Sequence, residues 1–390
     1  MVLEKIKPAS AGQERLINAL RNESYKVVGV FGPTGVGKTL LSLAYSLDAV
    51  REGRYAKVVI VRPMIDVTTG REVSIAEAGE SFYKIAREYL ADVLGPYVDL
   101  AEIDRMIEEG KIEIVDSHFL KGRSFDNTIV FIDDAQNLKI ESLLETIVRV
   151  GRGSRLIVAA DPIFQALRTG KSDPASVLRD ILASESRNDV IVVDLGVKDI
   201  VREGAKLGLR LLMEYRLRMR EMNEEELRAL QVIKVKSPDA DVITVIDLRH
   251  WISQYGISSE HVPGYLVVVK AGHLGRLVGK RGERVQAIEK ELKERVRGVE
   301  LSHNIMPLIR ALHPVSWVWK RVKDVDFRGS YIAVEIDEDV FGPFVGQRGV
   351  YVRFLEEVTK EMFGIGIRVV PVPPEEAKKS KQKQRRRKRK

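Results

Sequence analysis

Short apolar segments alternate with segments of helical periodicity along the first half of the chain. Five apolar segments are rich in β-branched residues and only five or six residues long: Lys26–Phe31, Lys57–Val61, Thr128–Asp133, Arg155–Ala160 and Asp189–Asp194. Between them, apolar residues recur at the spacing of a helix, as at Leu40, Leu43 and Leu47. Continuous apolar strands separated by helices predict an α/β fold with a parallel sheet that helices cover on both faces.

The pattern changes after the last of these strands. Residues Lys206–Leu230 form a charged and apolar run that predicts one long helix, and the turn Ser237-Pro238-Asp239 marks a domain boundary. Beyond it, two Gly-x-x-Gly segments, Gly279-Lys280-Arg281-Gly282 and Gly346-Gln347-Arg348-Gly349, form an internal repeat. Each follows a valine, opens a helix-patterned run and comes after a strand-like segment. The repeat predicts two small α+β units.

The amino-acid composition excludes several classes of protein. The chain has 390 residues, 44% of them hydrophobic and 31% charged, and is predicted to fold into two or three domains. It has no cysteine, which excludes disulfides and cysteine-ligated metal sites, and its six histidines lack metal-ligand spacing. No apolar run is long enough to span a membrane, and no signal peptide is recognisable, so a cytoplasmic protein is expected.

The net charge of +8 is concentrated at one end. The last thirteen residues, Lys378–Lys390, contain ten Lys or Arg and no acid, and subtracting them leaves −2 for the rest of the chain. The tail is expected to be disordered and to add salt-sensitive affinity for phosphates. The high net charge is therefore no argument for a basic face on the folded body.

A phosphate-binding loop follows the first strand. Residues Gly32-Pro33-Thr34-Gly35-Val36-Gly37-Lys38-Thr39 fit the pattern G-x-x-x-x-G-K-[ST], with a strand before and a helix after. Glycines let successive backbone N–H groups point at phosphates, and the helix N-terminus adds to that field. Lys38 is expected to reach the phosphates, and the Thr39 hydroxyl is expected to ligate Mg²⁺.

Two acidic residues end the strand Thr128–Asp133. If this strand lies next to the strand that enters the phosphate loop, Asp133 comes beside the metal and Asp134 beside the attacking water. Two solvated acids at a strand end are common, so the prediction depends on the phosphate loop. Together these residues predict a site for ATP and Mg²⁺.

The order of the motifs resembles PhoH-like ATPases, relatives of superfamily-1 helicases. The resemblance covers roughly residues 8–215, and its blocks are Gln13, the phosphate loop, Arg62-Pro63, Gly122-Arg123-Ser124, Asp133–Asn137, Arg149-Val150-Gly151, Ser154, Asp161 with Gln165, and Asp199-Ile200-Val201-Arg202. It implies that Gln13 reads the adenine edge and Gln165 senses the γ-phosphate. It also implies that Arg123 or Arg202 contacts the transferred phosphoryl, and that the chain assembles into a homo-oligomeric ring.

Two departures from the family pattern affect these expectations. The family usually has Glu at the position of Asp134, and the shorter side chain either slows hydrolysis or requires a water relay. The segment Gly70–Tyr97 lacks the family's Gly-Phe-Leu-Pro-Gly-like loop, where nucleic-acid contacts are usually assigned. No PIN nuclease domain is recognisable in the sequence, so nuclease activity is not expected.

Both Gly-x-x-Gly segments resemble the tandem KH units of NusA-like proteins. In such units the loop holds the backbone of single-stranded RNA against a helix N-terminus, with basic residues on the phosphates. This role is expected for Gly279, Lys280, Arg281 and Gly282, and again for Gly346, Gln347, Arg348 and Gly349. The predicted domains are the ATPase at 1–236, KH units at 237–302 and 303–372, and the basic tail at 373–390.

Three functions remain open from the sequence. The leading one is an RNA-stimulated ATPase that remodels or unwinds RNA, and the second is an RNA-binding scaffold whose nucleotide site is slow or silent because of Asp134. The third is a KH-containing GTPase of ribosome assembly, since Gly170-Lys171-Ser172-Asp173 nearly matches the guanine-reading Asn-Lys-x-Asp. ATP hydrolysis with RNA as partner fits more of the motifs.

Overall fold

The computed structural model describes residues 1–65, 68, 72–73, 77, 79–115, 122–164 and 173–373. It divides the chain into two compact units, the first made of Met1–Ala205 with Arg328–Ser330 and the second of the rest of the chain. The main division thus falls between Ala205 and Lys206, earlier than the boundary expected at Ser237. Gln165, Gly170–Ser172 and the basic tail Lys378–Lys390 lie outside the described residues. Among the described residues, no helix is both long and apolar enough to cross a membrane.

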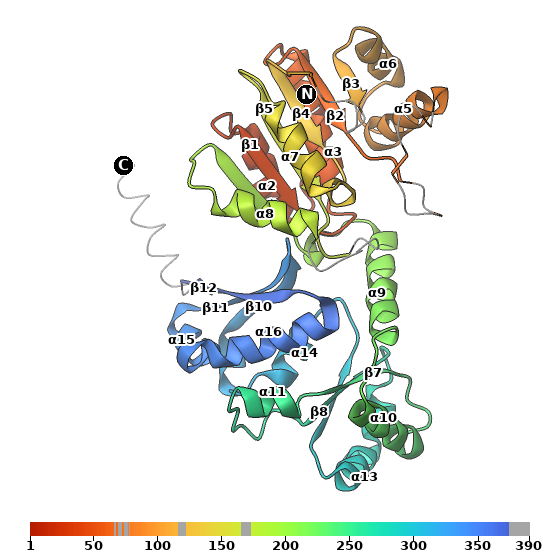
Figure 1. Cartoon of the computed structure of the whole chain (residues 1–390), viewed down its shortest axis with the longest axis vertical. Coiled ribbons are helices and arrows are strands. Elements are labelled where there is room, and N and C mark those ends of the chain that lie inside the picture. Colours follow the sequence, from red (N-terminus) through yellow and green to blue (C-terminus); the bar gives the residue numbers. More distant parts are fainter. Residues whose placement is uncertain are drawn as a thin grey trace. The chain divides into compact units, whose positions relative to one another are not determined.

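A six-stranded parallel sheet forms the centre of the first unit, in the order β3-β2-β4-β5-β1-β6 (Figure 1). Its strands are β1 Val27–Phe31, β2 Lys57–Val61, β3 Ile112–Val115, β4 Thr128–Ile132, β5 Arg155–Ala160 and β6 Val190–Asp194. The predicted α/β class and all five predicted strands of this sheet are confirmed. Strand β3, at the edge of the sheet, was not predicted.

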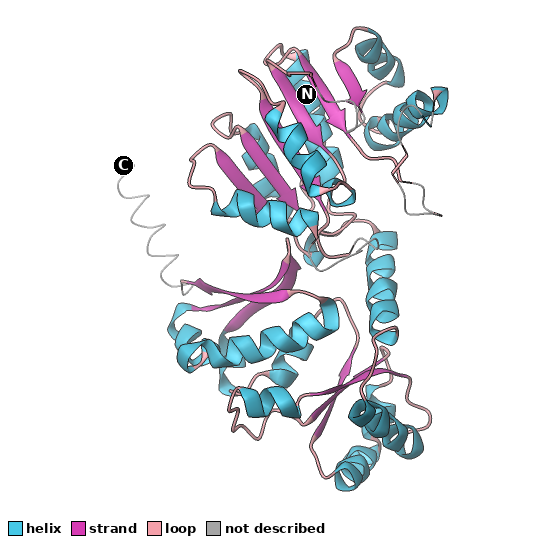
Figure 2. Cartoon of the chain, in the orientation of Figure 1, coloured by secondary structure: helices cyan, strands magenta, loops and turns pink. Residues whose placement is uncertain are grey.

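Helices cover both faces of this sheet (Figure 2). They are α1 Val2–Lys5, α2 Ala11–Arg21, α3 Lys38–Arg51, α5 Glu80–Leu94, α6 Leu100–Glu108, α7 Ile140–Val148 and α8 Pro174–Ser184. Helices α2 and α3 pack together on one face, and α7 and α8 on the other. The apolar strand residues are buried against these helices, which explains why they form continuous runs instead of alternating.

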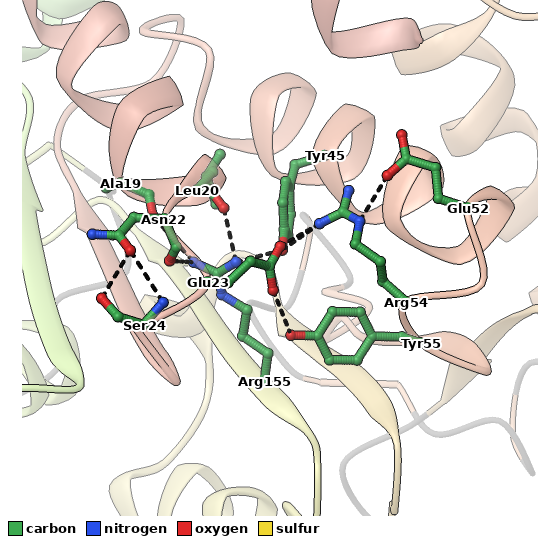
Figure 3. A network of polar contacts seen from close by, with 10 residues as sticks. All are labelled: Ala19, Leu20, Asn22, Glu23, Ser24, Tyr45, Glu52, Arg54, Tyr55 and Arg155. Atoms are coloured by element: carbon green, nitrogen blue, oxygen red, sulfur yellow. Dashed lines mark hydrogen bonds and ion pairs between the residues drawn. The ribbon is translucent and has the colours of Figure 1, made fainter.

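A buried arginine joins the sheet to α2 (Figure 3). Arg155 begins β5 and is fully buried, yet its guanidinium donates to the carbonyls of Leu20 at 2.8 Å and of Ala19 and Asn22 at 3.1 Å, and to the Tyr45 hydroxyl. These carbonyls lie at the C-terminal end of α2, where helix carbonyls lack intrahelical partners, and only that of Asn22 also accepts a backbone N–H, from Tyr25 at 3.2 Å. Arg155 therefore caps α2 from the sheet, while the opposite end of α2 carries Gln13.

The second unit contains two three-stranded sheets, β7-β8-β9 and β10-β11-β12. Their strands are β7 Val242–Asp247, β8 Tyr265–Val269, β9 Val296–Glu300, β10 Val322–Arg328, β11 Tyr331–Asp337 and β12 Gly366–Val372. The helices are α10 Glu224–Lys236, α11 Arg249–Gln254, α12 Leu274–Val278, α13 Glu283–Leu292, α14 Met306–Leu312, α15 Phe341–Val345 and α16 Val350–Phe363. Each Gly-x-x-Gly segment joins a short helix to a longer one: α12 to α13, and α15 to α16.

The long helix expected over Lys206–Leu230 is interrupted. The structure has α9 at Glu203–Arg218 and a separate α10 that begins after Asn223. The Asn223 side chain accepts from the Glu226 N–H, and the Glu226 carboxylate accepts from the Asn223 N–H, each at 2.9 Å. This capping box starts a new helix within a run whose apolar periodicity continues through it.

Candidate functional site

The phosphate loop curls between β1 and α3 as its sequence requires. Gly35 and Gly37 have φ angles of +87° and +92°, in the region that favours glycine. A Cβ on Gly32 would lie 2.7 Å from the Leu195 carbonyl oxygen, so a side chain is excluded there. The loop therefore needs its glycines both for conformation and for close packing.

Lys38 is held inside this curl. Its side chain is buried, and Nζ donates to the carbonyl oxygens of Gly32 at 2.7 Å and Pro33 at 2.9 Å. The ammonium group is thus fixed at the loop by backbone carbonyls. It is available for a bound anion because carbonyl oxygens are weaker partners for a cation than a charged phosphate.

Asp133 reaches the phosphate loop from β4. The Thr39 hydroxyl lies 3.0 and 3.1 Å from the two carboxylate oxygens of Asp133, which is 1% exposed. The expected adjacency of β4 and β1 is wrong, since β5 lies between them. The contact still forms because the loop leaves β1 and crosses the carboxyl ends of the parallel strands, where ligands bind in such sheets.

Two further side chains contact Asp133, and neither was predicted from the sequence to belong to the site. Tyr89 on α5 donates its hydroxyl to Asp133 Oδ2 at 2.8 Å, and Arg62, which follows β2, lies 3.3 Å from the same oxygen. Arg62 also pairs with Asp134 at 3.0 Å, and its guanidinium stacks 4.0 Å from the centre of the Tyr89 ring. Arg62 was visible in the Arg-Pro block, whereas nothing in the local pattern marked Tyr89.

The charge state of Asp133 reflects these neighbours. Burial and the negative charge of Asp134 raise the pKa of Asp133 to about 6, although Arg62, Tyr89 and Thr39 each oppose the shift. Burial alone lowers the pKa of Arg62, but the Asp134 and Asp133 carboxylates outweigh it, and the pKa is raised. The Arg62 guanidinium therefore opposes the protonation of Asp133 that burial favours.

Asp134 connects to the other side of the loop through a hydrogen-bond relay. Gln136 Nε2 donates to Asp134 Oδ1 at 3.2 Å, and Gln136 Oε1 accepts from the Asp161 N–H at 2.9 Å. Asp161 in turn accepts from the Thr34 N–H at 3.0 Å. Asp134 has a φ of +51°, a conformation that Asp tolerates better than most residues with a side chain.

Gln13, on helix α2, is buried next to the phosphate loop. Its Nε2 donates to the Val36 carbonyl at 3.0 Å, and its Oε1 accepts from the Ala9 N–H at 2.8 Å. The preceding Gly12 N–H donates to Asp199 at 3.1 Å, and the Val201 N–H donates to the Gly35 carbonyl at 3.1 Å. The first and last blocks of the resemblance thus meet at the phosphate loop.

The two candidate arginines lie in different places. Arg202 is exposed, and a Cβ on Gly35 would lie 3.5 Å from its Cβ, so it is next to the loop. Arg123 precedes β4 and pairs with Glu113 on β3, near the amino ends of the strands. About 20 Å of extended chain between residues 127 and 133 separates that edge from Asp133. Gln165 lies outside the described residues.

The available donors fit a hard divalent cation. Thr39 and Asp133 offer oxygen atoms, the donors that Mg²⁺ prefers, and Mg²⁺ commonly takes its remaining ligands from phosphates and water. Among the described residues, no group of three or more His, Asp or Glu could hold a metal by itself. The donor set therefore fits a metal that arrives with a nucleotide.

The two Gly-x-x-Gly loops share one backbone conformation. The φ angles are +77°, +55° and +81° at Gly279, Arg281 and Gly282, and +76°, +54° and +78° at the equivalent positions of the second loop, Gly346, Arg348 and Gly349. Both inner pairs, Lys280 with Arg281 and Gln347 with Arg348, are exposed. Each loop thus presents two long polar side chains at the start of a helix.

The side chain that packs against the first glycine differs between the two loops. A Cβ on Gly279 would lie 2.6 Å from the Arg284 side chain, whereas a Cβ on Gly346 would lie 2.6 Å from the Tyr351 ring. Arg284 and Tyr351 occupy equivalent positions in the repeat. The first glycine of each loop is therefore required because a side chain packs directly against it.

A parallel sheet, a glycine-rich loop that opens α3 and an acidic residue at the end of β4 define a P-loop NTPase fold. The family model described as PhoH-like protein matches residues 5–214, more than half of the chain, and the chain belongs to this family. A model described as KH domain matches residues 248–339, which include the first Gly-x-x-Gly loop and end before the second. The first match includes the phosphate loop, and the second includes one of the two Gly-x-x-Gly loops.

Several curated proteins are similar to the first unit. A PhoH-like protein of Bacillus subtilis is 26% identical over 51% of this chain and 61% of its own length, and one of Mycobacterium leprae is 25% identical over 50% and 55%. Protein PhoH2 of Mycolicibacterium smegmatis is 32% identical over 42% of this chain and 38% of its own length. The chain spans less than two thirds of the length of each of these relatives.

Among solved structures, one titled "Crystal structure of APE1850" aligns with 39% of this chain and 100% of its own, at 20% identity and a TM-score of 0.27.

Proposed function

We propose that the chain is an RNA-stimulated ATPase that remodels or unwinds single-stranded or structured RNA. The observation that carries the proposal is the contact of the Thr39 hydroxyl with Asp133 beside the buried Lys38. A P-loop lysine, a hydroxyl and a strand-end carboxylate are the groups that phosphoryl transfer from a nucleotide requires. The exposed Gly-x-x-Gly loops supply the RNA contact.

The roles of the residues at the nucleotide follow from their positions. The N–H groups of the loop and Lys38 would bind the phosphates, Gln13 would contact the adenine, and Thr39 with Asp133 would hold Mg²⁺. When bound, Mg²⁺ supplies positive charge to the phosphates. Asp134 would orient the attacking water, and Arg202, the candidate arginine that lies beside the loop, would stabilise the transferred phosphoryl, with Gln165 sensing its presence.

The second unit would bind RNA as a pair of KH domains. The proposed domains are 1–236 for the ATPase, 237–302 and 303–372 for the KH units, and 373–390 for the basic tail. The near-identical φ angles of the two loops support a second KH domain beyond the one that the family model matches. Lys280, Arg281 and Arg348 would contact phosphates, and the glycines would let the RNA backbone approach.

The test is the ATPase rate of the full chain with single-stranded RNA, single-stranded DNA or no polymer, each at two salt concentrations. Turnover is expected with Mg²⁺, is expected to rise with RNA and is expected to be lost in Lys38→Ala. Equal turnover by Lys38→Ala and the wild type would overturn the proposal. A strand-displacement assay with a labelled duplex then separates unwinding from simple RNA-stimulated hydrolysis.

A slow-ATPase scaffold is the second candidate, because Asp134 is one methylene shorter than the Glu usual in the family. The scaffold would bind RNA through the same loops with the nucleotide site nearly silent. Robust hydrolysis by the wild type would exclude it. In either form we propose that the protein acts in the cytoplasm. We also propose that it assembles with copies of itself into a ring, and sedimentation in the presence of ATP would test this assembly.

A further inference from the structure

Arg62 lies between the two acidic residues of the nucleotide site. One terminal nitrogen is 3.3 Å from Asp133 Oδ2, the other is 3.0 Å from Asp134 Oδ2, and a third of the side chain is exposed. The guanidinium also lies over the Tyr89 ring, 4.0 Å from its centre. A single cation thus pairs with both carboxylates at the carboxyl edge of the sheet.

Asp133 is already surrounded by donors in this arrangement. The Thr39 hydroxyl contacts both of its oxygens, and the Tyr89 hydroxyl and Arg62 share Oδ2. A carboxylate offers about four lone-pair sites, and a second cation beside Arg62 would be repelled by it. A divalent cation can therefore bind Asp133 well only if Arg62 withdraws.

We propose that Arg62 is an exchangeable counter-ion: it pairs with Asp133 and Asp134 while the site is empty, and it leaves them for the γ-phosphate when Mg²⁺ and ATP bind. The inference rests on the proposed ATPase function. Guanidinium is suited to the exchange because its fork of N–H donors matches phosphate as well as carboxylate. Tyr89 acts as a positioning residue, since its ring holds the guanidinium and its hydroxyl holds Asp133.

Displacement of one cation by another predicts a specific effect on metal affinity. Mn²⁺ serves as the probe, and its binding to the full chain is followed by electron paramagnetic resonance with ADP present, so that no turnover is needed. Arg62→Gln removes the competing charge and is expected to tighten Mn²⁺ binding about tenfold, whereas Arg62→Lys keeps the charge and is expected to leave the affinity near that of the wild type.

The matched control is Arg87→Gln. Arg87 lies on the same helix as Tyr89 and pairs with Asp104 at 2.6 Å, on the surface and outside the site. Its removal is expected to change neither Mn²⁺ affinity nor turnover. If Arg62→Gln and Arg87→Gln give the same Mn²⁺ affinity, the exchange is excluded.

The ATP turnover of Arg62 variants tests the proposed contact between Arg62 and the γ-phosphate. Arg62→Gln is expected to lower kcat about 100-fold while the KM for ATP changes little, because the γ-phosphate contact strengthens as charge develops. Arg62→Lys is expected to lower kcat about tenfold, since it keeps the charge but loses the fork. A wild-type kcat in Arg62→Lys would overturn the γ-phosphate contact, and this variant carries the test if Arg62→Gln does not fold.

The two proposals fail in different ways. If the wild type hydrolyses no ATP, the proposed function is wrong, while the Mn²⁺ titration still decides whether Arg62 competes with the metal. If the wild type is active and Arg62→Gln matches it in both Mn²⁺ affinity and kcat, only the inference about Arg62 is wrong.

Discussion

Arg155 illustrates how much one residue can contribute far from any candidate ligand. Replacing it with Met leaves the carbonyls of Ala19 and Leu20 without their donor inside the fold and removes one of the two donors to the Asn22 carbonyl. A buried polar group without a partner costs about 1–3 kcal/mol, so we expect Arg155→Met to lower the free energy of unfolding by about 2–5 kcal/mol. Urea denaturation measures the change.

Arg54 provides the matched control for this prediction. It belongs to the same network (Figure 3) and pairs with Glu23 and Glu52, but about a third of its side chain is exposed. Partly exposed ion pairs contribute up to about 1 kcal/mol, so Arg54→Met should cost less than Arg155→Met. Equal losses would show that the carbonyl cap on α2 has no special importance.

Asp134 decides between the ATPase and the slow scaffold. A residue that orients the attacking water contributes through its charge, and we expect Asp134→Asn to lower kcat about 100-fold with ATP affinity nearly unchanged. Steady-state turnover and binding of a fluorescent ATP analogue measure the two quantities. A large gain in turnover from Asp134→Glu would instead favour the scaffold, although the φ of +51° suits Asp better than Glu.

At the level of elements, sequence patterns predicted the buried strands well because their apolar runs are local. Strand β3 was not predicted, because Ile112–Val115 lies at the edge of the sheet and includes Glu113, which interrupts the apolar run. The break between α9 and α10 was not predicted, because the capping box that starts α10 is made by polar side chains and leaves the apolar periodicity intact. The order of strands, with β5 between β4 and β1, cannot be obtained from local patterns at all.

The candidate site was predicted as far as its motifs are contiguous in the sequence. The loop with Lys38 and Thr39 could be placed, and so could Asp133, because a strand end is a local feature. Tyr89 could not, since its contact with Asp133 depends on how α5 packs, 44 residues away along the chain. Arg62 could be noticed as part of a block but not assigned, because its two partners follow a different strand.

The exposed pairs of the Gly-x-x-Gly loops allow a direct test of RNA contact. Substituting Lys280 and Arg281 together by Asp reverses two charges in a loop whose glycines are kept, so we expect affinity for single-stranded RNA to fall at least about tenfold. Fluorescence anisotropy at two salt concentrations measures it, with circular dichroism as the check on folding.

The matching double substitution, Gln347 and Arg348 to Asp, tests the second unit. If both loops bind RNA, it also weakens binding, by less per substitution because only one native cation is lost. Unchanged affinity in this variant, together with a loss in the first, would limit RNA contact to the KH domain that contains Gly279–Gly282.

His313 makes the second unit sensitive to pH. Its Nδ1 accepts from the Val315 N–H at 3.0 Å and its Nε2 lies 2.9 Å from the Phe344 carbonyl, just before the second loop, an arrangement that a neutral ring satisfies. Burial lowers the pKa of His313 below its ordinary 6.5, although the contacts of the ring with the Phe344 and Val315 carbonyls oppose the shift. Near pH 6 the unfolded chain therefore binds more protons than the folded one, and acid favours unfolding.

We expect the contribution of His313 to the unfolding free energy to decrease from about pH 6.5 downward, until the pH reaches the lowered pKa of the folded state. Asp133, whose pKa is raised to about 6, contributes in the opposite direction and does so equally in the variant. In His313→Gln that part of the pH dependence should vanish, even if the variant is less stable at every pH. Urea denaturation at pH 7.5, 6.5 and 5.5 gives both slopes. Identical slopes would mean that His313 does not titrate on unfolding.

For the whole molecule, the distribution of charge separates general from specific binding. Ten positive charges lie in residues 378–390, and the rest of the chain carries −2. We propose that the two small loops make the specific contact with RNA, and that the tail adds electrostatic attraction that any polyanion can satisfy. The two contributions would respond differently to salt, since the tail carries most of the positive charge that would release counterions.

Deleting Lys378–Lys390 tests this division. Because each neutralised phosphate adds about 0.9 to the salt slope on a duplex and about 0.7 on a single strand, the truncated chain should bind RNA more weakly and with a clearly shallower slope of log affinity against log salt. Its ATPase should still respond to RNA at low salt, since the loops and the nucleotide site remain. If the deletion abolished every response to RNA at low salt, the tail would be the binding element and the role assigned to the Gly-x-x-Gly loops would be wrong.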